Sequence, residues 1–305
     1  MKQRSIQNTW KRENRELMVL LTPFAIMIII FCYIPLWGLV IAFQDYLAGN
    51  SLFAISTAKW VGLKHFKRFV NSMFFGRILR NTIRLSLLHL AFGFTIPILF
   101  ALLLNEVRNV HYKRFVQTVS YMPHFISTVV VAGMMLSFLD INGIVNTLRA
   151  AFGLPGKSYI TDPKAYPVIY TILTTWKGFG FSSILYFSTI TAIDPSLYES
   201  ARMDGANRWQ QMHITLPGIQ YIIAVKLVLQ VGSILSSNTN LALLLYRPAT
   251  YSTSDTIGTY IYREGIISGK FSYTTAVGLF MSIIEFALTF LTNKISNRLT
   301  GYGLW

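Results

Sequence analysis

Long apolar stretches separated by short polar segments dominate this chain of 305 residues. Six stretches reach the roughly 20 residues that an α-helix needs to cross the hydrocarbon core of a bilayer. They span residues 17–43, 84–104, 115–139, 165–193, 218–241 and 271–293. Only 13% of residues are charged, against about 25% in an ordinary soluble domain. The pattern therefore predicts an all-α, polytopic membrane protein with six transmembrane helices.

Residues 194–217 interrupt this pattern, because they are polar and rich in helix-terminating residues. Asp194 can cap a helix and Pro195 suits its first position. Gly205 suits the left-handed position that follows a helix, and Pro217 is expected to close a second one. One face of that second helix carries Trp209, Met212, His213 and Leu216. We predict two short amphipathic helices that meet at Gly205 and form a docking surface for a protein partner.

The same segment carries a family resemblance. Glu199-Ser200-Ala201, then Asp204-Gly205-Ala206 and finally Ile214-x-Leu216-Pro217 resemble the EAA loop of permease subunits of ATP-binding-cassette (ABC) importers. Residues 33–38, 271–280 and 303–305 are similar to the carbohydrate branch, in particular to LplB-like oligosaccharide permeases. The chain also resembles permeases of alginate importers. The resemblance covers nearly the whole chain and implies a type I importer (MetI-like) transmembrane domain.

The resemblance also implies a set of partners. The chain would be one half of a pore in the bacterial cytoplasmic (inner) membrane, paired with a second related permease as a heterodimer. A solute-binding protein would deliver oligosaccharide outside, and ATP and Mg would bind a separate ABC ATPase dimer, with no cofactor or metal on this chain. The implied ATPase-coupling residues are Glu199, Ser200, Ala201, Asp204, Gly205, Ala206, Trp209, Leu216 and Pro217.

One departure from the family pattern concerns the spacing inside the loop. Eight residues separate Gly205 from Ile214, where the family pattern usually has nine. One missing residue turns the rest of a continuous helix by about 100°. The docking face of residues 209–213 is therefore not fixed by the resemblance.

Basic residues near the first stretch indicate the orientation. Lys2, Arg4, Lys11, Arg12 and Arg15 precede it, and the next base after it is Lys59. Because bases close to the first span usually remain inside, both termini are expected in the cytoplasm. The domains are then a basic tail (1–16) attracted to membrane lipid, a first span with an outer segment (17–81), a core (82–293) and a tail (294–305). In the outer segment, the spacing of Leu63, Phe66, Val70 and Phe74 predicts an amphipathic helix, either interfacial or a docking surface for the substrate carrier.

Polar side chains inside the apolar stretches are the candidate solute pathway. A charge at the bilayer centre costs about 2.5–3.5 kcal/mol on insertion scales, so it faces protein or water. Helix–helix association explains serine and threonine at such places but does not require charges. We favour a pathway, and a Lys226–Glu285 ion pair is the alternative. Trp176 and Lys177 are the expected sugar contacts, with packing as the alternative for Trp176. The candidates are His89, Trp176, Lys177, Lys226, Gln230, Ser233, Ser237, Asn240, Ser282 and Glu285.

Charge outside the membrane bears on the substrate. The segments expected to be extracytoplasmic hold twelve bases and five acids. A positive entrance concentrates anionic solutes, which favours an acidic oligosaccharide such as an alginate-type uronate.

Other function classes fit less well. The net charge of +15 comes without the aromatic-interleaved basic surface of a nucleic-acid binder. Gly156-Lys157-Ser158 lacks the earlier glycine of a P-loop, since residue 151 is alanine. An ion-coupled secondary transporter using Glu285 or His89 would show inverted repeats, and none is evident. A membrane enzyme acting on lipid-linked sugar would need clustered acids or histidines, whereas the twelve acids are scattered.

Overall fold

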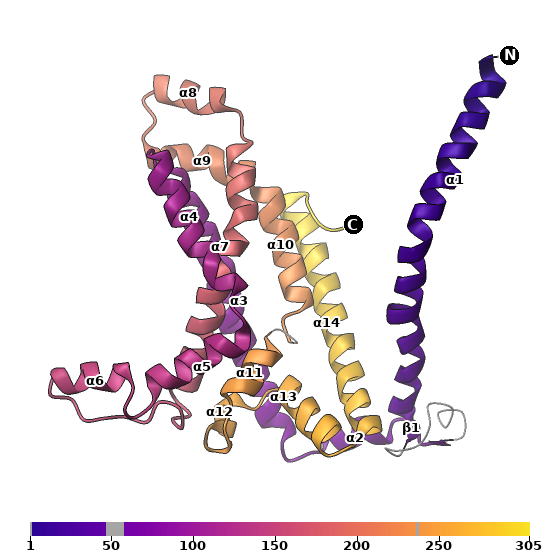
Figure 1. The fold of residues 1–305 in the computed structure, drawn as a ribbon, viewed down its shortest axis with the longest axis vertical. Coiled ribbons are helices and arrows are strands. Elements are labelled where there is room, and N and C mark those ends of the chain that lie inside the picture. Colours follow the sequence, from indigo (N-terminus) through magenta and orange to yellow (C-terminus); the bar gives the residue numbers. More distant parts are fainter. Residues whose placement is uncertain (1, 47–57, 236–237) are drawn as a thin grey trace. The chain divides into compact units, whose positions relative to one another are not determined.

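The computed structural model describes residues 2–46, 58–235 and 238–305 and is mostly helical (Figure 1). The chain divides into two compact units. Unit 1 comprises Met1–Asn71 and Glu264–Phe280, and unit 2 comprises Ser72–Arg263 and Met281–Trp305. The long helix α14 (Phe271–Thr300) contributes its first ten residues to unit 1 and the rest to unit 2.

Unit 1 begins with one long helical segment. The α-helix α1 (Lys2–Ile28) continues as a π-helical stretch, η1 (Ile29–Tyr33), and then as a 3₁₀ stretch, η2 (Ile34–Phe43). Pro35 lies in the first turn of η2, where its missing N–H removes one bond of a continuous α-helix. The two-residue strands β1 (Gln44–Asp45) and β2 (Lys59–Trp60) pair antiparallel. The residues of η5 (Tyr262–Ile267) from Glu264 onward also belong to this unit.

Helix α2 (Lys64–Val70) is shorter than expected and buries a different face. Leu63 and Val70 of the expected apolar face are exposed, whereas His65 and Phe69 are buried. Phe69 packs against Phe280 with ring centroids 5.9 Å apart. His65 lies 3.1 Å from the carbonyl oxygen of Gln44. Tertiary contacts inside unit 1, and not helical periodicity, select the buried face.

Unit 2 contains the remaining helices. They are α3 (Phe75–Asn105), α4 (Val110–Phe125), α5 (Thr128–Leu139), α6 (Ile144–Ala151), α7 (Tyr166–Thr191), α8 (Pro195–Met203), α9 (Arg208–Gly218), α10 (Gln220–Gly232), α11 (Thr239–Leu245), η4 (Pro248–Thr250), α12 (Tyr251–Ser254) and α13 (Ile257–Ile261). Helix α7 packs along both α3 and α4. Helices α8 and α9 lie crosswise at one end of these helices (Figure 1).

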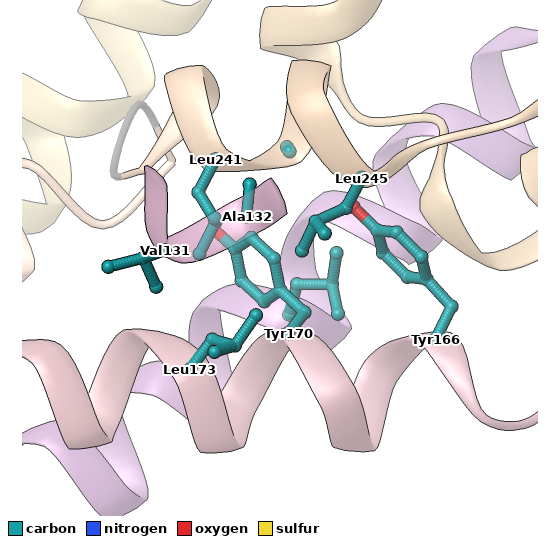
Figure 2. Close-up of a cluster of buried hydrophobic side chains, with 9 residues drawn as sticks. Val131, Ala132, Tyr166, Tyr170, Leu173, Leu241 and Leu245 are labelled. Carbon is teal, nitrogen blue, oxygen red and sulfur yellow. The ribbon is translucent and has the colours of Figure 1, made fainter. Parts of the chain in front are cut away.

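The buried core of unit 2 forms where four helices meet. Figure 2 shows Tyr166 and Tyr170 rising from α7 toward α11 and α5, where Tyr170 lies beside Ala132 and Leu241. Leu85 of α3 belongs to the same cluster. Nearer α9, a second cluster joins Ala101, Leu102, Tyr186, Ile190 and Ile219. Helix α7 contributes to both clusters, so it is the central helix of unit 2.

Two of the six expected spans are broken. Ser127 caps α5 and separates it from α4, which interrupts residues 115–139. Residues 218–241 divide into the end of α9, then α10 and α11. By length and apolar content, the described residues hold four candidate spans: Asn14–Phe43, Phe75–Asn105, Thr128–Ala151 and Phe271–Thr300. A pair bent by 59°, Arg208–Gly218 with Gln220–Gly232, makes a fifth. The threonine-rich α7, although 26 residues long, is not among them.

Two glycines of α7 offer a matched test of the packing between α4 and α7. A Cβ at Gly180 would overlap the backbone carbonyl of Ser120 in α4, whereas a Cβ at Gly178 would meet nothing within 4 Å. We expect Gly180→Ala to lower the stability by about 1–3 kcal/mol, as overpacking does. Gly178→Ala is expected to be neutral or to stabilise by up to about 1 kcal/mol. Thermal unfolding of the purified protein in detergent measures both, and equal midpoints would contradict the close approach.

Candidate functional site

The polar segment between α7 and α10 folds as two helices with an ordered start. Asp194 Oδ1 accepts a hydrogen bond of 3.0 Å from the backbone N–H of Ser196, and Pro195 occupies the first turn of α8. Hydrogen bonds from the Ser196 backbone and side chain lower the pKa of Asp194. The predicted cap and the proline position are confirmed.

Gly205 ends α8 in the left-handed conformation, with φ of 79°. Its N–H donates to the carbonyl of Arg202 at 3.0 Å, and the N–H of Ala206 donates to Ala201 at 2.8 Å. These two bonds form a Schellman motif, which satisfies carbonyls at the helix end. The expected role of Gly205 as the junction of the two helices is confirmed.

Helix α9 has its own cap, which sequence analysis missed. Asn207 Oδ1 accepts from the N–H of Gln210 at 2.9 Å, and Gln210 Oε1 accepts from the N–H of Asn207 at 2.7 Å. The Asn-x-x-Gln spacing was the available signal. Because this cap fixes the first turn of α9 at Arg208, the eight-residue spacing does not act through one continuous helix. Pro217 lies inside α9, which ends one residue later, at Gly218.

Side-chain contacts hold the two helices together and to α3. We refer to α8, Gly205 and α9 together as the elbow. Tyr198 Oη and Thr215 Oγ1 share a hydrogen bond of 2.9 Å between α8 and α9. Arg208 donates to Glu106, just after α3, at 2.7 Å. The elbow is therefore an internally braced unit.

The solvent-exposed surface of the elbow combines apolar and charged groups. Met203 and Trp209 are 88% and 77% exposed. Glu199, Ser200, Asp204, Gly205, Leu216 and Pro217 are also exposed, while Ala201 and Ala206 are half-buried. A cleft of about 670 Å³ beside it is lined by Glu199, Arg202 and Arg108 among others. Large exposed apolar side chains rimmed by charges are typical of a protein-docking surface.

A second candidate site is a cavity of about 250 Å³ among α3, α7 and α10. Four of the predicted pathway residues line it: His89, Lys226, Gln230 and Ser233. The α7 side of the cavity was missed; it carries Thr174, Thr175, Gly178, Phe179, Ser182 and Tyr186. Residues 175, 179, 182 and 186 recur at helical spacing, so this face could have been found by its periodicity.

The other predicted pathway residues lie elsewhere. Trp176 lines an adjacent apolar groove, which shares Thr175 and Phe179 with the cavity, and Lys177 donates to the carbonyl of His124 at 3.1 Å. Neither lines the polar cavity. Asn240 and Ser282 are exposed on α11 and α14, and Ser237 falls outside the described residues.

Glu285 is engaged by the chain itself. Its Oε1 accepts a hydrogen bond of 3.0 Å from the N–H of Leu235. Among the ion pairs of the described residues, none joins Lys226 to Glu285. The alternative of a Lys226–Glu285 pair that holds α10 to α14 is therefore not supported.

Residues 93–301 match the model of the family described as binding-protein-dependent transport system inner membrane component. The chain belongs to this family. This permease is 39% identical over 295 residues to the polygalacturonan/rhamnogalacturonan transport system permease protein YteP of Bacillus subtilis, covering 96% of this chain and 91% of YteP. It is 37% identical over 296 residues to protein LplB of the same organism, covering 96% and 92%.

Solved structures also resemble the permease. One is a bacterial ABC transporter involved in the import of the acidic polysaccharide alginate, with 41% identity and a TM-score of 0.87 over 96% of this chain and 99% of that chain. Another is a bacterial alginate ABC transporter in complex with an alginate pentasaccharide-bound periplasmic protein, with 41% identity and a TM-score of 0.88 over 97% and 99%. The type I (MetI-like) importer fold is confirmed. The chain is a membrane permease subunit, and a separate ATPase hydrolyses the ATP.

Proposed function

We propose that this permease forms one half of the pore of a bacterial importer for acidic oligosaccharides. The observation that carries the proposal is the 41% identity and TM-score of 0.87 to a transporter involved in alginate import. The relative YteP, a polygalacturonan/rhamnogalacturonan permease by name, points to the same substrate class. A polar cavity lined by Lys226 is in keeping with an anionic solute.

The proposed assembly contains four kinds of subunit. A second, related permease completes the pore as a heterodimer, and an ABC ATPase dimer binds ATP and Mg. An extracytoplasmic solute-binding protein delivers the sugar; its presence is supported by the relative solved with a periplasmic protein. The five bases before the first span support cytoplasmic termini in the inner membrane.

In this assembly the elbow transmits motion. Closure of the ATPase dimer pushes on the exposed face of α8 and α9, and the bent connection to α10 carries the push into the membrane helices. Such a lever must be stiff. The Schellman bonds at Gly205 and the Tyr198–Thr215 hydrogen bond between α8 and α9 supply that stiffness.

Charge in the outer segments supports an anionic substrate. Four of the five outer acids already pair with a base, in the contacts Asp45–Lys64, Asp162–Lys157, Asp255–Arg263 and Glu264–Lys270. Because the outer segments hold twelve bases and only five acids, they carry a positive excess, which raises the local concentration of anionic sugar.

Competitive uptake tests the substrate class. The reconstituted complex in proteoliposomes receives a uronate oligosaccharide and a neutral oligosaccharide of equal length, with ATP inside. We expect preferential uptake of the uronate. Preference for the neutral chain would overturn the proposed substrate class. An ATPase that co-purifies with the permease is expected as well, since an ion-coupled secondary transporter would bring down none.

A further inference from the structure

The cavity among α3, α7 and α10 has a distinctive electrostatic character. Twelve described residues line it, and Lys226 is the only one with a permanent charge. No aspartate or glutamate is among them. A positive group in a membrane segment normally pairs or faces a functional cavity, because an isolated one is costly. Within the described part of the chain, no ion pair includes Lys226.

Two further polar atoms at the cavity lack partners. His89 Nδ1 and Thr175 Oγ1 are buried and make no hydrogen bond within the described part of the chain. Thr175 is only 8% exposed, and both residues line the cavity. Buried polar atoms in folded proteins are nearly always hydrogen-bonded. A cation together with two orphaned polar atoms indicates a site for a ligand that carries a negative charge and hydroxyl groups.

We propose that Lys226 binds the carboxylate of one uronate unit as the sugar passes through the membrane. Gln230, His89 and Thr175 then bind the hydroxyl groups of the same unit. This subsite rests on the proposed import of acidic oligosaccharides and adds the place where the acid group is recognised. It differs from attraction at the outer entrance, because the charge lies inside the helical unit.

The size of the cavity sets how much sugar it holds. Its volume of about 250 Å³ is below the roughly 300–1,000 Å³ of sites for drug-sized ligands. One sugar ring fits, and a longer chain must pass unit by unit. Phe179 and Tyr186 line the cavity too and offer aromatic surface to the apolar face of the ring.

A pair of matched substrates tests the subsite in the whole reconstituted complex. One is a uronate oligosaccharide, and the other is the same oligosaccharide after reduction of its carboxyl groups to alcohols. We expect Lys226→Met to lower uptake of the uronate about tenfold or more, the effect of losing a hydrogen bond to a charged group. Uptake of the reduced sugar should stay within about twofold, and Lys226→Arg should retain most uronate uptake.

Lys177→Met is the matched control, since it removes a base from α7 that lies outside the cavity. It should leave the ratio of acidic to neutral uptake unchanged. If the wild type takes up the uronate preferentially and Lys226→Met keeps that preference, the subsite is wrong while the proposed function stands. A wild type that prefers the reduced sugar overturns the proposed function and the subsite together. Equal losses of uptake for both sugars in Lys226→Met also overturn the subsite. If the methionine variant fails to assemble, Lys226→Gln, which keeps a polar head group, gives the same comparison.

Discussion

Replacing Gly205 by valine is expected to reduce sugar uptake roughly 5–150-fold while the permease still inserts into the membrane. Gly205 has φ of 79°, and a Cβ there would meet nothing within 4 Å. The penalty is therefore purely conformational, about 1–3 kcal/mol for a residue other than glycine in this region. For a β-branched residue such as valine the penalty lies at the upper end of this range, because such residues rarely adopt the left-handed conformation. The strain opens the Schellman motif and separates the direction of α9 from that of α8. ATP-driven uptake and sugar-stimulated ATP hydrolysis, measured on one preparation, report the coupling.

The chain offers a close control for that variant. Gly153 follows α6 with φ of 69°, and a Cβ added there would also meet nothing within 4 Å. It sits in the same two-bond motif, since its N–H donates to Ala150 and that of Leu154 to Arg149, both at 2.9 Å. Gly153→Val thus imposes equal strain outside the elbow and should spare the ratio of uptake to ATP hydrolysis. Gly205→Asn should retain most activity, because asparagine tolerates the left-handed region. Normal uptake by Gly205→Val would show that the elbow does not transmit the motion.

Local rules explain which parts of the elbow could be predicted from sequence. The cap at Asp194, the proline at position 195 and the glycine at position 205 each depend on a few neighbouring residues, and the structure contains all three. The same rules also contained the Asn207–Gln210 cap, which was overlooked. Predictions of this kind succeed because the hydrogen-bond partners are close neighbours in sequence.

The breaks in the membrane helices and the set of residues that line the cavity depend on tertiary packing. The chemistry of its side chain favours Trp176 as a sugar contact. The cavity, however, is lined by its neighbour Thr175. One residue corresponds to about 100° around a helix, so the tryptophan side chain faces an apolar groove. Likewise, the break between α4 and α5 at Ser127 occurs inside a continuous apolar stretch. Hydropathy measures the length of such a stretch but not its interruptions.

A buried ion cluster in unit 2 was also beyond sequence analysis, since Arg77 and Asp255 lie 178 positions apart. Asp255 is fully buried, with both oxygens bound by Arg263 at 2.9 Å. Arg77 of α3 donates to Asp255 at 3.0 Å, and Thr259 Oγ1 does so at 3.0 Å. The cluster fastens α12, α13 and the start of η5 to the first turn of α3.

Asp255→Ala is therefore expected to destabilise the permease by up to about 3–5 kcal/mol, because it leaves two half-buried arginines without their buried counter-charge. Thermal unfolding in detergent, with the yield of intact importer complex, measures the loss. Glu264→Gln is the control: its pair with Lys270 is 2.6 Å long, but that lysine side chain is 45% exposed, and such surface pairs contribute about 0–1 kcal/mol.

Combining Asp255→Asn with Arg77→Gln should recover part of the stability lost in Asp255→Asn alone, because one uncompensated charge is removed with the acid. Additive losses in the double variant would mean that the arginine and the aspartate act independently, and that the pair does not fasten α12 and α13 to α3.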